Sequence, residues 1–326
     1  MHRRGGWGPF TGGTSLGRSP VGRPGEARDA AGPGRVTAMG SAMGSHPLPV
    51  PTTAAGREGL AALLERPGRA VVGLDFDGTL AEIVPDPDQA RAHPGAVPAL
   101  SRLAPRLRSV AVITGRPAEV AVRYGGFAGA EGLNGLVVLG LYGAERWDAA
   151  SGAVQAPEPH PGVAAVQAEL PAVLEEYGAA QGTWIEDKGR AVAVHTRRAE
   201  DPQATFELLR APLHALAERH GLIVEPGRLV LELRPPGMDK GVALTEYVRR
   251  TDAEAVLYAG DDLGDLAAFA AVERLREEGV PGVLVCSGSS EVTELAERAD
   301  LVVDGPAGVV ELLSSLADAV SGANAS

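Results

Sequence analysis

The stretch Val71-Val72-Gly73-Leu74-Asp75-Phe76-Asp77-Gly78-Thr79-Leu80 joins an apolar run directly to two acids, a glycine and a hydroxyl. In open α/β sheets, ligands bind beyond the carboxyl ends of the strands. Asp75 and Asp77 are two positions apart, so in an extended segment their side chains leave the same face of the chain. Two carboxylates this close repel each other unless a cation or a shared proton separates them. The stretch therefore predicts a buried strand that ends in a functional pair of acids.

These two acids suit phosphoryl chemistry with a magnesium ion. Mg²⁺ prefers oxygen ligands and is typically held by one or two carboxylates together with water and substrate phosphate oxygens. An ionised Asp75 could then attack phosphorus and form an aspartyl-phosphate. Asp77 could act first as general acid toward the leaving oxygen and later as general base toward water. Taken alone, the same residues also fit a purely local acidic turn, which Asp and Gly favour.

The remaining sequence alternates β-branched runs with Ala-, Leu-, Glu- and Arg-rich segments, which predicts an α/β fold: a parallel sheet with helices on both faces. Continuous apolar runs are typical of strands that are covered on both sides. The predicted strands of this sheet are Ala70 to Leu74, Val110 to Ile113, Leu136 to Leu139, Val256 to Ala259, Gly282 to Val285 and Leu301 to Val303.

A segment with a different sequence pattern begins near Ala149 and ends near Pro235. Its predicted helices and alternating strands, which indicate a separate α+β unit, are Val163 to Tyr177, Pro202 to His220, Ala191 to Thr196 and Leu229 to Leu233. The predicted order of parts is a disordered Gly-, Pro- and Arg-rich extension over 1–57, a first core part over 58–148, an inserted α+β cap over 149–235, a second core part over 236–320, and a frayed tail over 321–326.

Two further segments carry groups that could bind a phosphate, one directly after a predicted strand and one at the start of a predicted helix. Val110 to Ile113 is followed by Thr114-Gly115-Arg116-Pro117, where the Thr114 hydroxyl and the following N–H groups could bind a phosphate oxygen at a helix start. The alternative is an ordinary helix N-cap before a proline. Lys240 begins another helix and could offset charge among carboxylates and phosphate, although an exposed lysine is the commoner case.

A third segment, Tyr258-Ala259-Gly260-Asp261-Asp262-Leu263-Gly264-Asp265, ends an apolar strand in three acids. Asp261 is the best candidate for a direct metal ligand. Asp262 and Asp265 are candidates for orienting Lys240 or bound water behind it. Solvated loop acids are the alternative for this segment alone.

The net charge, apolar runs and cysteine content of the chain limit the partners and the cellular setting that are expected. The chain has 30 Lys and Arg against 42 Asp and Glu, a net charge of -12, which disfavours broad binding to nucleic acid. No apolar stretch approaches the length of a membrane span, so no membrane partner is expected. Cys286 is the single cysteine, which excludes an intramolecular disulfide and favours a reducing, cytoplasmic setting.

In this order, the four motifs resemble those of the haloacid dehalogenase superfamily, over roughly residues 70–305. The resemblance implies a modified Rossmann-like core. It assigns Asp75 as nucleophile, Asp77 as acid and base, and Thr114 and Lys240 as holders of the phosphoryl group. It places Mg²⁺ between Asp75, the backbone carbonyl of Asp77, and Asp261. Aspartate at position 77 is typical of the phosphatases in this superfamily rather than of the related ATPases.

Within that superfamily the chain resembles the trehalose-6-phosphate phosphatases. The resemblance is carried by Asp75 to Leu80, Ile113-Thr114-Gly115-Arg116, Trp184-Ile185-Glu186-Asp187-Lys188-Gly189 and Leu231-Glu232-Leu233-Arg234-Pro235. It implies hydrolysis of a phosphosugar, trehalose 6-phosphate, as the last step of trehalose biosynthesis, with a trehalose-phosphate synthase as a partner. The substrate-binding residues that it implies are Gly115, Arg116, Glu186, Lys188, Arg197, Arg228 and Glu232. Each of those in the cap could instead belong to a salt-bridged surface strand, and His195 fits a packed strand residue better than a ligand.

The chain departs from the family at two places: Gly264-Asp265-Leu266-Ala267 follows Leu263 where further acids are common, and Tyr142 stands where a histidine is frequent. These departures leave the catalytic acids intact and bear on sugar specificity. Two alternatives follow. One is a phosphatase for another phosphosugar, such as sucrose phosphate or mannosyl-phosphoglycerate. The other is a sugar-phosphate-binding module without turnover, which a lost nucleophile or metal ligand would mark.

Overall fold

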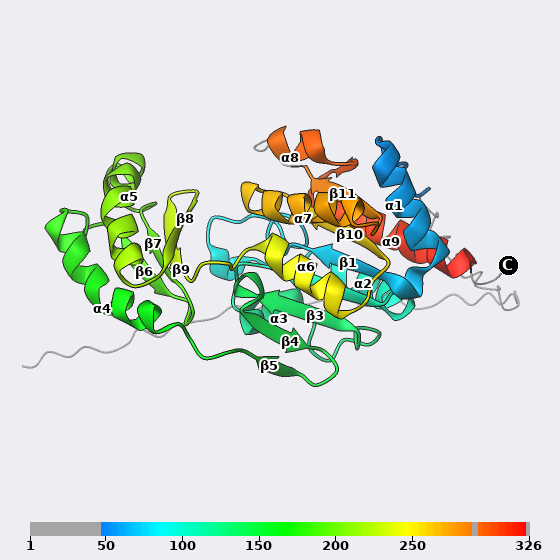
Figure 1. The fold of residues 1–326 in the computed structure, drawn as a ribbon, viewed down its shortest axis with the longest axis horizontal. Helices are drawn as coiled ribbons and strands as arrows, with labels where there is room; N and C mark the ends of the chain where they lie inside the picture. The colour runs from blue at the N-terminus through cyan, green and yellow to red at the C-terminus, as the bar shows by residue number, and fades with distance from the viewer. Residues whose placement is uncertain (1–46, 289–292, 324–326) are drawn as a thin grey trace, which may run out of the picture. The chain divides into compact units, whose positions relative to one another are not determined.

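A computed structural model describes residues 47–288 and 293–323, and these residues form an eight-stranded sheet and a separate four-stranded sheet (Figure 1). The larger sheet has the order β12-β11-β10-β1-β2-β3-β4-β5. Its strands are β1 Ala70–Leu74, β2 Ser109–Ile113, β3 Leu136–Gly140, β4 Glu145–Asp148, β5 Ala153–Gln155, β10 Ala255–Gly260, β11 Gly282–Ser287 and β12 Leu301–Val303.

Strands β12 to β3 of the larger sheet are parallel, and β4 and β5 extend it antiparallel. All six predicted strands of the parallel sheet are present, within two residues at each end. The short hairpin of β4 and β5 was not predicted, because its residues have no continuous apolar run. It carries the sheet to Gln155, beyond the expected end of the first core part at 148.

Helices cover both faces of the larger sheet, as its continuous apolar strands require. Side chains of β1 alternate between two cores: Val72 and Leu74 pack with the helices of one face, and Val71 with those of the other. The helices of the first face are α1 Ala54–Glu65, α2 Ala96–Leu103, α3 Ala118–Gly125 and α9 Gly305–Ala323. Those of the second face are α6 Lys240–Arg250, α7 Leu266–Glu277 and α8 Thr293–Arg298.

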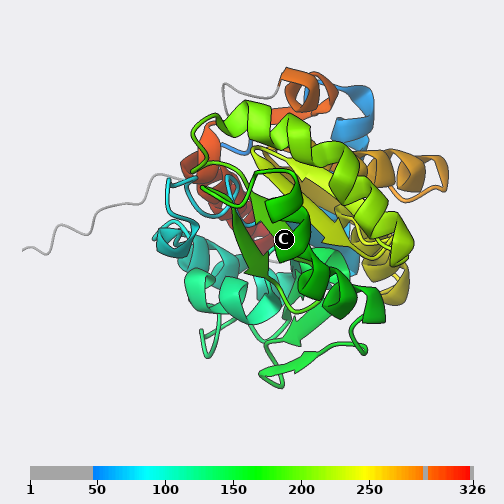
Figure 2. The same cartoon turned by 90° about the vertical axis from the view of Figure 1, so that its left-hand side faces the viewer.

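The four-stranded sheet is antiparallel, with the order β6-β7-β9-β8. Its strands are β6 Trp184–Asp187, β7 Val192–His195, β8 Ile223–Gly227 and β9 Val230–Arg234, and its helices are α4 Pro161–Glu176 and α5 Pro202–Arg219. Both helices lie on one face of this sheet (Figure 2). They pack there against side chains such as Val192, Val194 and Leu231. The alternate side chains, which include Ala193 and Glu232, therefore form a face that α4 and α5 do not cover, called here the helix-free face.

Near the ends of the chain, two element boundaries differ from the expected ones. Residues 1–46 and 324–326 lie outside the described residues, so the disorder expected there is untested. The expected boundary at residue 57 falls inside α1, which begins at Ala54 because the Thr53 hydroxyl accepts from the Gly56 N–H. Residues 321–323, expected to fray, continue α9, and the Ser321 hydroxyl donates to the Ala317 carbonyl at 2.6 Å.

Short 3-10 turns complete the described chain: η1 Pro67–Arg69, η2 Pro87–Gln89, η3 Ala104–Arg106, η4 Leu141–Gly143 and η5 Leu263–Asp265.

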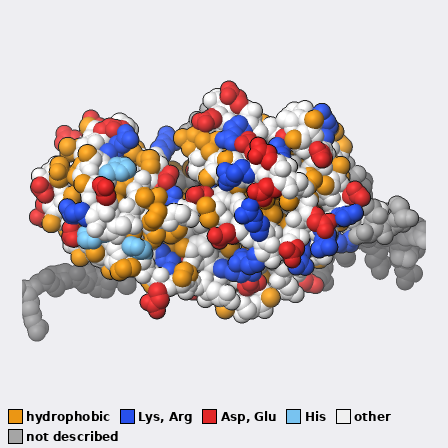
Figure 3. Space-filling view, in the orientation of Figure 1, with side chains coloured by type: hydrophobic (Ala, Val, Ile, Leu, Met, Phe, Trp, Pro, Cys, Tyr) orange, Lys and Arg blue, Asp and Glu red, His pale blue; other side chains and the backbone are white. Residues whose placement is uncertain are grey.

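Among the described residues, no helix has both the length and the apolar character needed to span a membrane. Acidic and basic side chains are interspersed over the face shown in Figure 3.

Candidate active site

The predicted acids and the predicted threonine follow adjacent parallel strands. Strand β1 pairs with β10 on one side and with β2 on the other, so that Leu74 lies between Ala259 and Val112. Parallel strands end at the same edge of a sheet. Residues that follow these strands, Asp75, Thr114 and Asp261, are therefore brought to one edge, where all three side chains are buried.

Three buried carboxylates gather at this edge: one oxygen each from Asp75, Asp261 and Asp265 lie within 4.8 Å of one another. Burial raises the pKa of Asp75 well above its usual value, and the neighbouring acids act in the same direction. The Lys240 ammonium lowers it but does not outweigh burial. The cluster thus holds more negative charge than its one lysine offsets.

Lys240 reaches this cluster from the first residue of α6. The Asp239 carboxylate caps that helix by accepting from the Val242 N–H at 2.8 Å, which fixes where the helix begins. The Lys240 Nζ lies 3.0 Å from Asp75 Oδ2 and 2.8 Å from Asp265 Oδ1, and it is buried. Burial works against its charge, but the two carboxylates raise the pKa of Lys240 well above its usual value, so it remains an ammonium.

Asp265 is held by donors on both of its carboxylate oxygens. Oδ1 accepts from Lys240 and from the Tyr258 hydroxyl at 2.6 Å, and Oδ2 accepts from the N–H groups of Asp261 and Asp262. Burial opposes its charge, but Lys240 and these hydrogen bonds outweigh burial and lower the pKa of Asp265. With both oxygens occupied, Asp265 orients Lys240 and the Asp261 turn.

Asp261 differs from Asp265 because its Oδ1 is buried and accepts from no described residue. Burial, and then the charges of Asp265 and Asp262, raise the pKa of Asp261 to about 8. The Gly78 backbone packs closely against this carboxylate: a Cβ at Gly78 would lie 1.9 Å from Asp261 Oδ2. A buried carboxylate oxygen without a hydrogen-bond partner, next to Asp75, fits a bound divalent cation.

Asp77 pairs with Arg116 rather than with the buried cluster. The Arg116 Nε and Nη2 donate to its two carboxylate oxygens, each at 2.7 Å, in a bidentate pair. Burial opposes the charge of Arg116, but the hydrogen bond and the charge of Asp77 raise the pKa of the guanidinium. The Asp77 side chain is 38% exposed, so it is nearer to solvent than the buried carboxylate cluster.

The turn after β2 places Thr114 and Gly115. The Thr114 hydroxyl accepts from the Arg116 N–H at 3.1 Å, and the Thr114 carbonyl accepts from the Tyr142 N–H at 3.0 Å. A Cβ at Gly115 would lie 2.6 Å from the Tyr142 hydroxyl oxygen. Tyr142 therefore covers the predicted phosphate-binding turn from the side of β3.

Predicted cap residues lie on the helix-free face of the smaller sheet. Glu186 accepts from His195 Nε2 at 2.8 Å, and this hydrogen bond lowers the pKa of Glu186. The His195 ring stacks on Trp184 with centroids 4.1 Å apart. His195 is thus the packed strand residue that was expected, and it orients a carboxylate on this face.

Lys188 and Glu232 form a second pair on the same face, with Nζ 2.5 Å from Oε2. Burial opposes the charge of Lys188, but Glu232 and then Tyr142 raise its pKa. The other oxygen of Glu232 is buried without a hydrogen bond from any described residue. A buried acceptor of this kind suits a hydroxyl donor from a ligand.

Two predicted cap residues are placed differently. Arg197 follows β7 and Arg228 precedes β9, and both are exposed. Arg198, which was not predicted, lies over the Trp184 ring at 4.6 Å. Arg234 was also not predicted, although its even spacing from Glu232 along β9 was a signal that both side chains share a face.

Comparisons with known proteins identify the family of this chain. The family model described as Trehalose-phosphatase matches residues 73–303. This chain belongs to the trehalose-phosphatase family. The trehalose-phosphate phosphatase of Mycolicibacterium paratuberculosis is 35% identical over 324 residues, which cover 93% of this chain and 77% of that protein.

Solved structures of fungal proteins show the same fold. Trehalose-6-phosphate phosphatase of Aspergillus fumigatus is 26% identical with a TM-score of 0.57, and the match covers 79% of this chain and 97% of that one. The C-terminal domain of the trehalose-6-phosphate phosphatase of C. albicans has a TM-score of 0.66 at 21% identity, with coverage of 83% and 99%. The matched model spans the stretch from Gly73 to Val303, and so includes Asp75, Thr114, Lys240 and Asp261 together with the smaller sheet.

Proposed function

We propose that this protein hydrolyses trehalose 6-phosphate to trehalose and phosphate through an aspartyl-phosphate on Asp75. The observation that carries the proposal is the gathering of Asp75, Lys240 and Asp261 at one edge of the sheet, from three elements far apart in sequence. Membership of the trehalose-phosphatase family supports the choice of substrate.

Mg²⁺ is the proposed cofactor. Its ligands would be the carboxylates of Asp75 and Asp261 and the backbone carbonyl of Asp77, and the unsatisfied Oδ1 of Asp261 supports this set. When bound, Mg²⁺ supplies the positive charge that keeps these buried carboxylates ionised beside a phosphate. Asp265 has both oxygens occupied and serves instead to fix Lys240.

The first half-reaction uses Asp75 and Asp77. An Asp75 carboxylate oxygen attacks phosphorus, and the bond between phosphorus and the sugar oxygen breaks as the aspartyl-phosphate forms. Asp77 donates a proton to the departing oxygen, so that trehalose leaves as a neutral alcohol. Lys240 and the Thr114 hydroxyl hold the phosphoryl oxygens during this transfer.

The second half-reaction regenerates the enzyme. Asp77, now ionised, takes a proton from a water molecule whose oxygen attacks phosphorus. The bond between phosphorus and Asp75 breaks, which releases phosphate and restores the carboxylate. Arg116 supports Asp77 in this role because its bidentate pair holds both carboxylate oxygens in place.

The unit from Pro161 to Arg234 is proposed to be the cap that selects the disaccharide. Its helix-free face offers Glu186, Lys188 and Glu232, carboxylates that accept from sugar hydroxyls and an ammonium that can donate to hydroxyl or phosphate oxygens. Closure of such a cap excludes bulk water from the reaction. Arg197 and Arg228 remain predicted substrate contacts. A cytoplasmic location and a synthase partner also remain predictions.

Phosphate release from a panel of phosphosugars tests this proposal. Trehalose 6-phosphate, glucose 6-phosphate and sucrose 6-phosphate are compared with Mg²⁺ at equal concentration. A strong preference for trehalose 6-phosphate is expected, because both glucose units would contact the cap. Equal turnover of all three would contradict the substrate, and no turnover of any would favour a binding module.

A further inference from the structure

We propose that Tyr142 and Arg234 form a latch between the helix-free face of the cap and the Thr114 turn, and that these two residues position the cap over the bound disaccharide. This inference rests on the proposed function. It concerns two side chains that lie outside the set predicted to act on phosphate or sugar.

The backbone at Tyr142 is strained. Leu141, Tyr142 and Gly143 have φ angles of 47°, 57° and 94°, and non-glycine residues rarely occupy this region. Two hydrogen bonds hold the turn against the phosphate-binding turn: the Leu141 N–H donates to the Arg116 carbonyl at 2.9 Å, and the Tyr142 N–H donates to the Thr114 carbonyl. Strain of this kind persists only where the surroundings impose it, and it is concentrated at functional sites.

The Tyr142 side chain lies between the two sheets. Its hydroxyl end abuts Gly115, and the Arg234 guanidinium lies over its ring at 4.8 Å from the centroid. Burial, and then the charge of Glu232, raise the pKa of Tyr142 to about 12, against the opposing charges of Lys188, Lys240 and Arg234. Tyr142 therefore stays neutral, with core groups on one side and cap groups on the other.

Arg234 is buried and incompletely satisfied. Its Nη2 donates to Glu225 Oε2 at 2.8 Å, whereas Nε and Nη1 are buried without a hydrogen bond among the described residues. The face of the Tyr142 ring supplies an electrostatic partner for this charge. Because Glu225 meets only Nη2, the ring contact offsets part of the cost of burying the rest of this cation, and it favours the arrangement in which Arg234 meets Tyr142.

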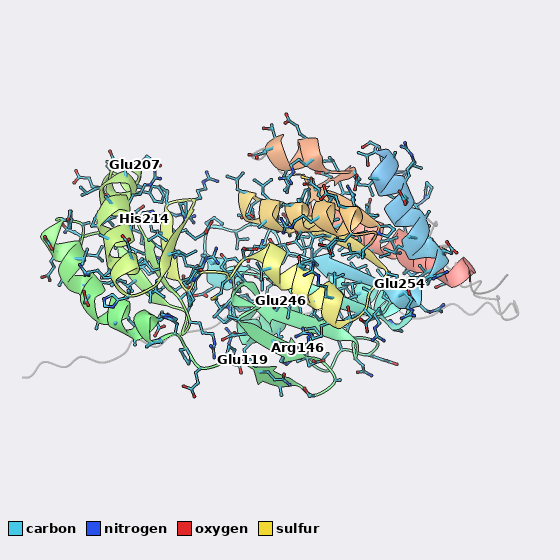
Figure 4. The ribbon with its side chains drawn as sticks, viewed as in Figure 1. Glu119, Arg146, Glu207, His214, Glu246 and Glu254 are labelled. Carbon is cyan, nitrogen blue, oxygen red and sulfur yellow. The ribbon has the colours of Figure 1, made fainter. Side chains whose placement is uncertain are left out.

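Arg234 is also well placed to act on the cap. It is the last residue of β9, the strand that carries Glu232, and the chain then runs through Gly237 to Lys240. A cavity of about 150 Å³ lies beside this connection, lined by Tyr142, Gly237 and Met238 and by residues that include Arg146 on β4 and Glu246 on α6 (Figure 4). The connection is thus loosely packed on this side, which leaves side-chain contacts to fix the cap.

The latch predicts a specific kinetic pattern. Arg234→Gln removes the cation, and Tyr142→Leu removes the ring face. Each variant should raise KM for trehalose 6-phosphate by about 5- to 30-fold, the range of a partly buried cation–π contact. In Arg234→Gln, hydrolysis of p-nitrophenyl phosphate, which has no disaccharide for the cap to hold, should be unchanged. The double variant should be no worse than either single variant, and Tyr142→Phe should retain wild-type KM because the ring remains.

Arg198→Gln is the matched control. Arg198 lies over the Trp184 ring at 4.6 Å from the centroid, a similar distance, but both residues belong to the cap, so this variant should leave KM unchanged. Independent losses that multiply in the Arg234→Gln/Tyr142→Leu double variant would overturn the latch, as would an Arg234→Gln variant with wild-type KM. Equal loss of p-nitrophenyl phosphate hydrolysis would show damage to the catalytic edge and would also overturn it.

Hydrogen–deuterium exchange tests the latch without any substrate. In Arg234→Gln, amides of the turn 141–144 and of the hairpin tip 188–191 should exchange faster than in the wild-type protein, whereas Arg198→Gln should not change them. Unchanged exchange in Arg234→Gln would contradict the latch. If the wild-type protein releases no phosphate from trehalose 6-phosphate, the proposed function fails, while the exchange result still decides on the latch.

Discussion

The ammonium of Lys240 lies 3.0 Å from the carboxylate of Asp75, and both side chains are buried. One cation cannot offset the cluster, because Asp261 and Asp265 also lie within reach of the same volume. Burial accordingly holds the pKa values of Asp75 and Asp261 above their usual range. The site therefore requires a further positive charge before Asp75 can act as a nucleophile, and this requirement is the physical basis of the proposed Mg²⁺ site.

Asp265→Asn should lower the free energy of unfolding by about 3–5 kcal/mol at neutral pH, because it breaks a buried ion pair on one side. The pKa of Asp265 is lowered on folding, so its contribution is present above the unfolded pKa and is lost as the pH falls through the folded value. The difference from the wild-type protein should hence shrink below about pH 4. Chemical denaturation with a chelator present measures both values.

Asp262→Asn is the control for that experiment. Its side chain is 60% exposed and caps η5, so its loss should cost only about 1 kcal/mol. An equal cost for the two variants would contradict the assignment of Asp265 as the buried anchor of Lys240.

Mg²⁺ binding should depend on pH through Asp261. With a pKa of about 8 in the absence of metal, Asp261 is mostly protonated below that pH, so a cation must displace a proton there. Affinity for Mg²⁺ should rise with pH through about 8, as Asp261 loses its proton. Titration calorimetry in buffers of different ionisation enthalpy measures the released proton, and pH-independent affinity without proton release would contradict this role.

Gly78→Ala should abolish Mg²⁺ binding and phosphatase activity. Gly78 has a φ of 73°, and a Cβ there would collide with Asp261 Oδ2. Gly126→Ala is a matched control, because Gly126 has a φ of 67° with open space around it. Both variants strain the backbone. An equal loss of Mg²⁺ binding in the two would show that backbone strain causes the loss, and not a collision with Asp261.

Glu232→Gln should raise KM for trehalose 6-phosphate by about 10- to 100-fold, the cost of weakening buried hydrogen bonds to a charged group. Hydrolysis of p-nitrophenyl phosphate should be unaffected. Glu207→Gln serves as control, because Glu207 is exposed on α5, away from the helix-free face (Figure 4). An unchanged KM in Glu232→Gln would remove Glu232 from the sugar site.

Much of the core could be predicted from the sequence because its signals are local. Continuous apolar runs mark the parallel strands, and the acids of the site directly follow β1 and β10. The pairing of these strands then brings Asp75 and Asp261 together without further information. Local structure also places Lys240, because the Asp239 side chain caps the helix that Lys240 begins.

Contacts between distant segments could not be predicted in the same way. The Arg116 pair with Asp77 depends on how two loops approach each other, and the Arg234 contact with Tyr142 depends on how the cap meets the core. Sequence pattern also gave no reason to prefer Arg198 over Arg197 as the residue on the Trp184 ring. In each case the deciding information is three-dimensional packing rather than local propensity.

Phosphate release from trehalose 6-phosphate with Mg²⁺, by the wild-type protein and by Asp75→Asn, tests the central claim most directly. The expected result is rapid release by the wild-type protein and none above background by Asp75→Asn, with thermal unfolding confirming that the variant is folded. Release by a folded Asp75→Asn variant at a rate near that of the wild-type protein would contradict the nucleophilic role of Asp75 and the mechanism built on it.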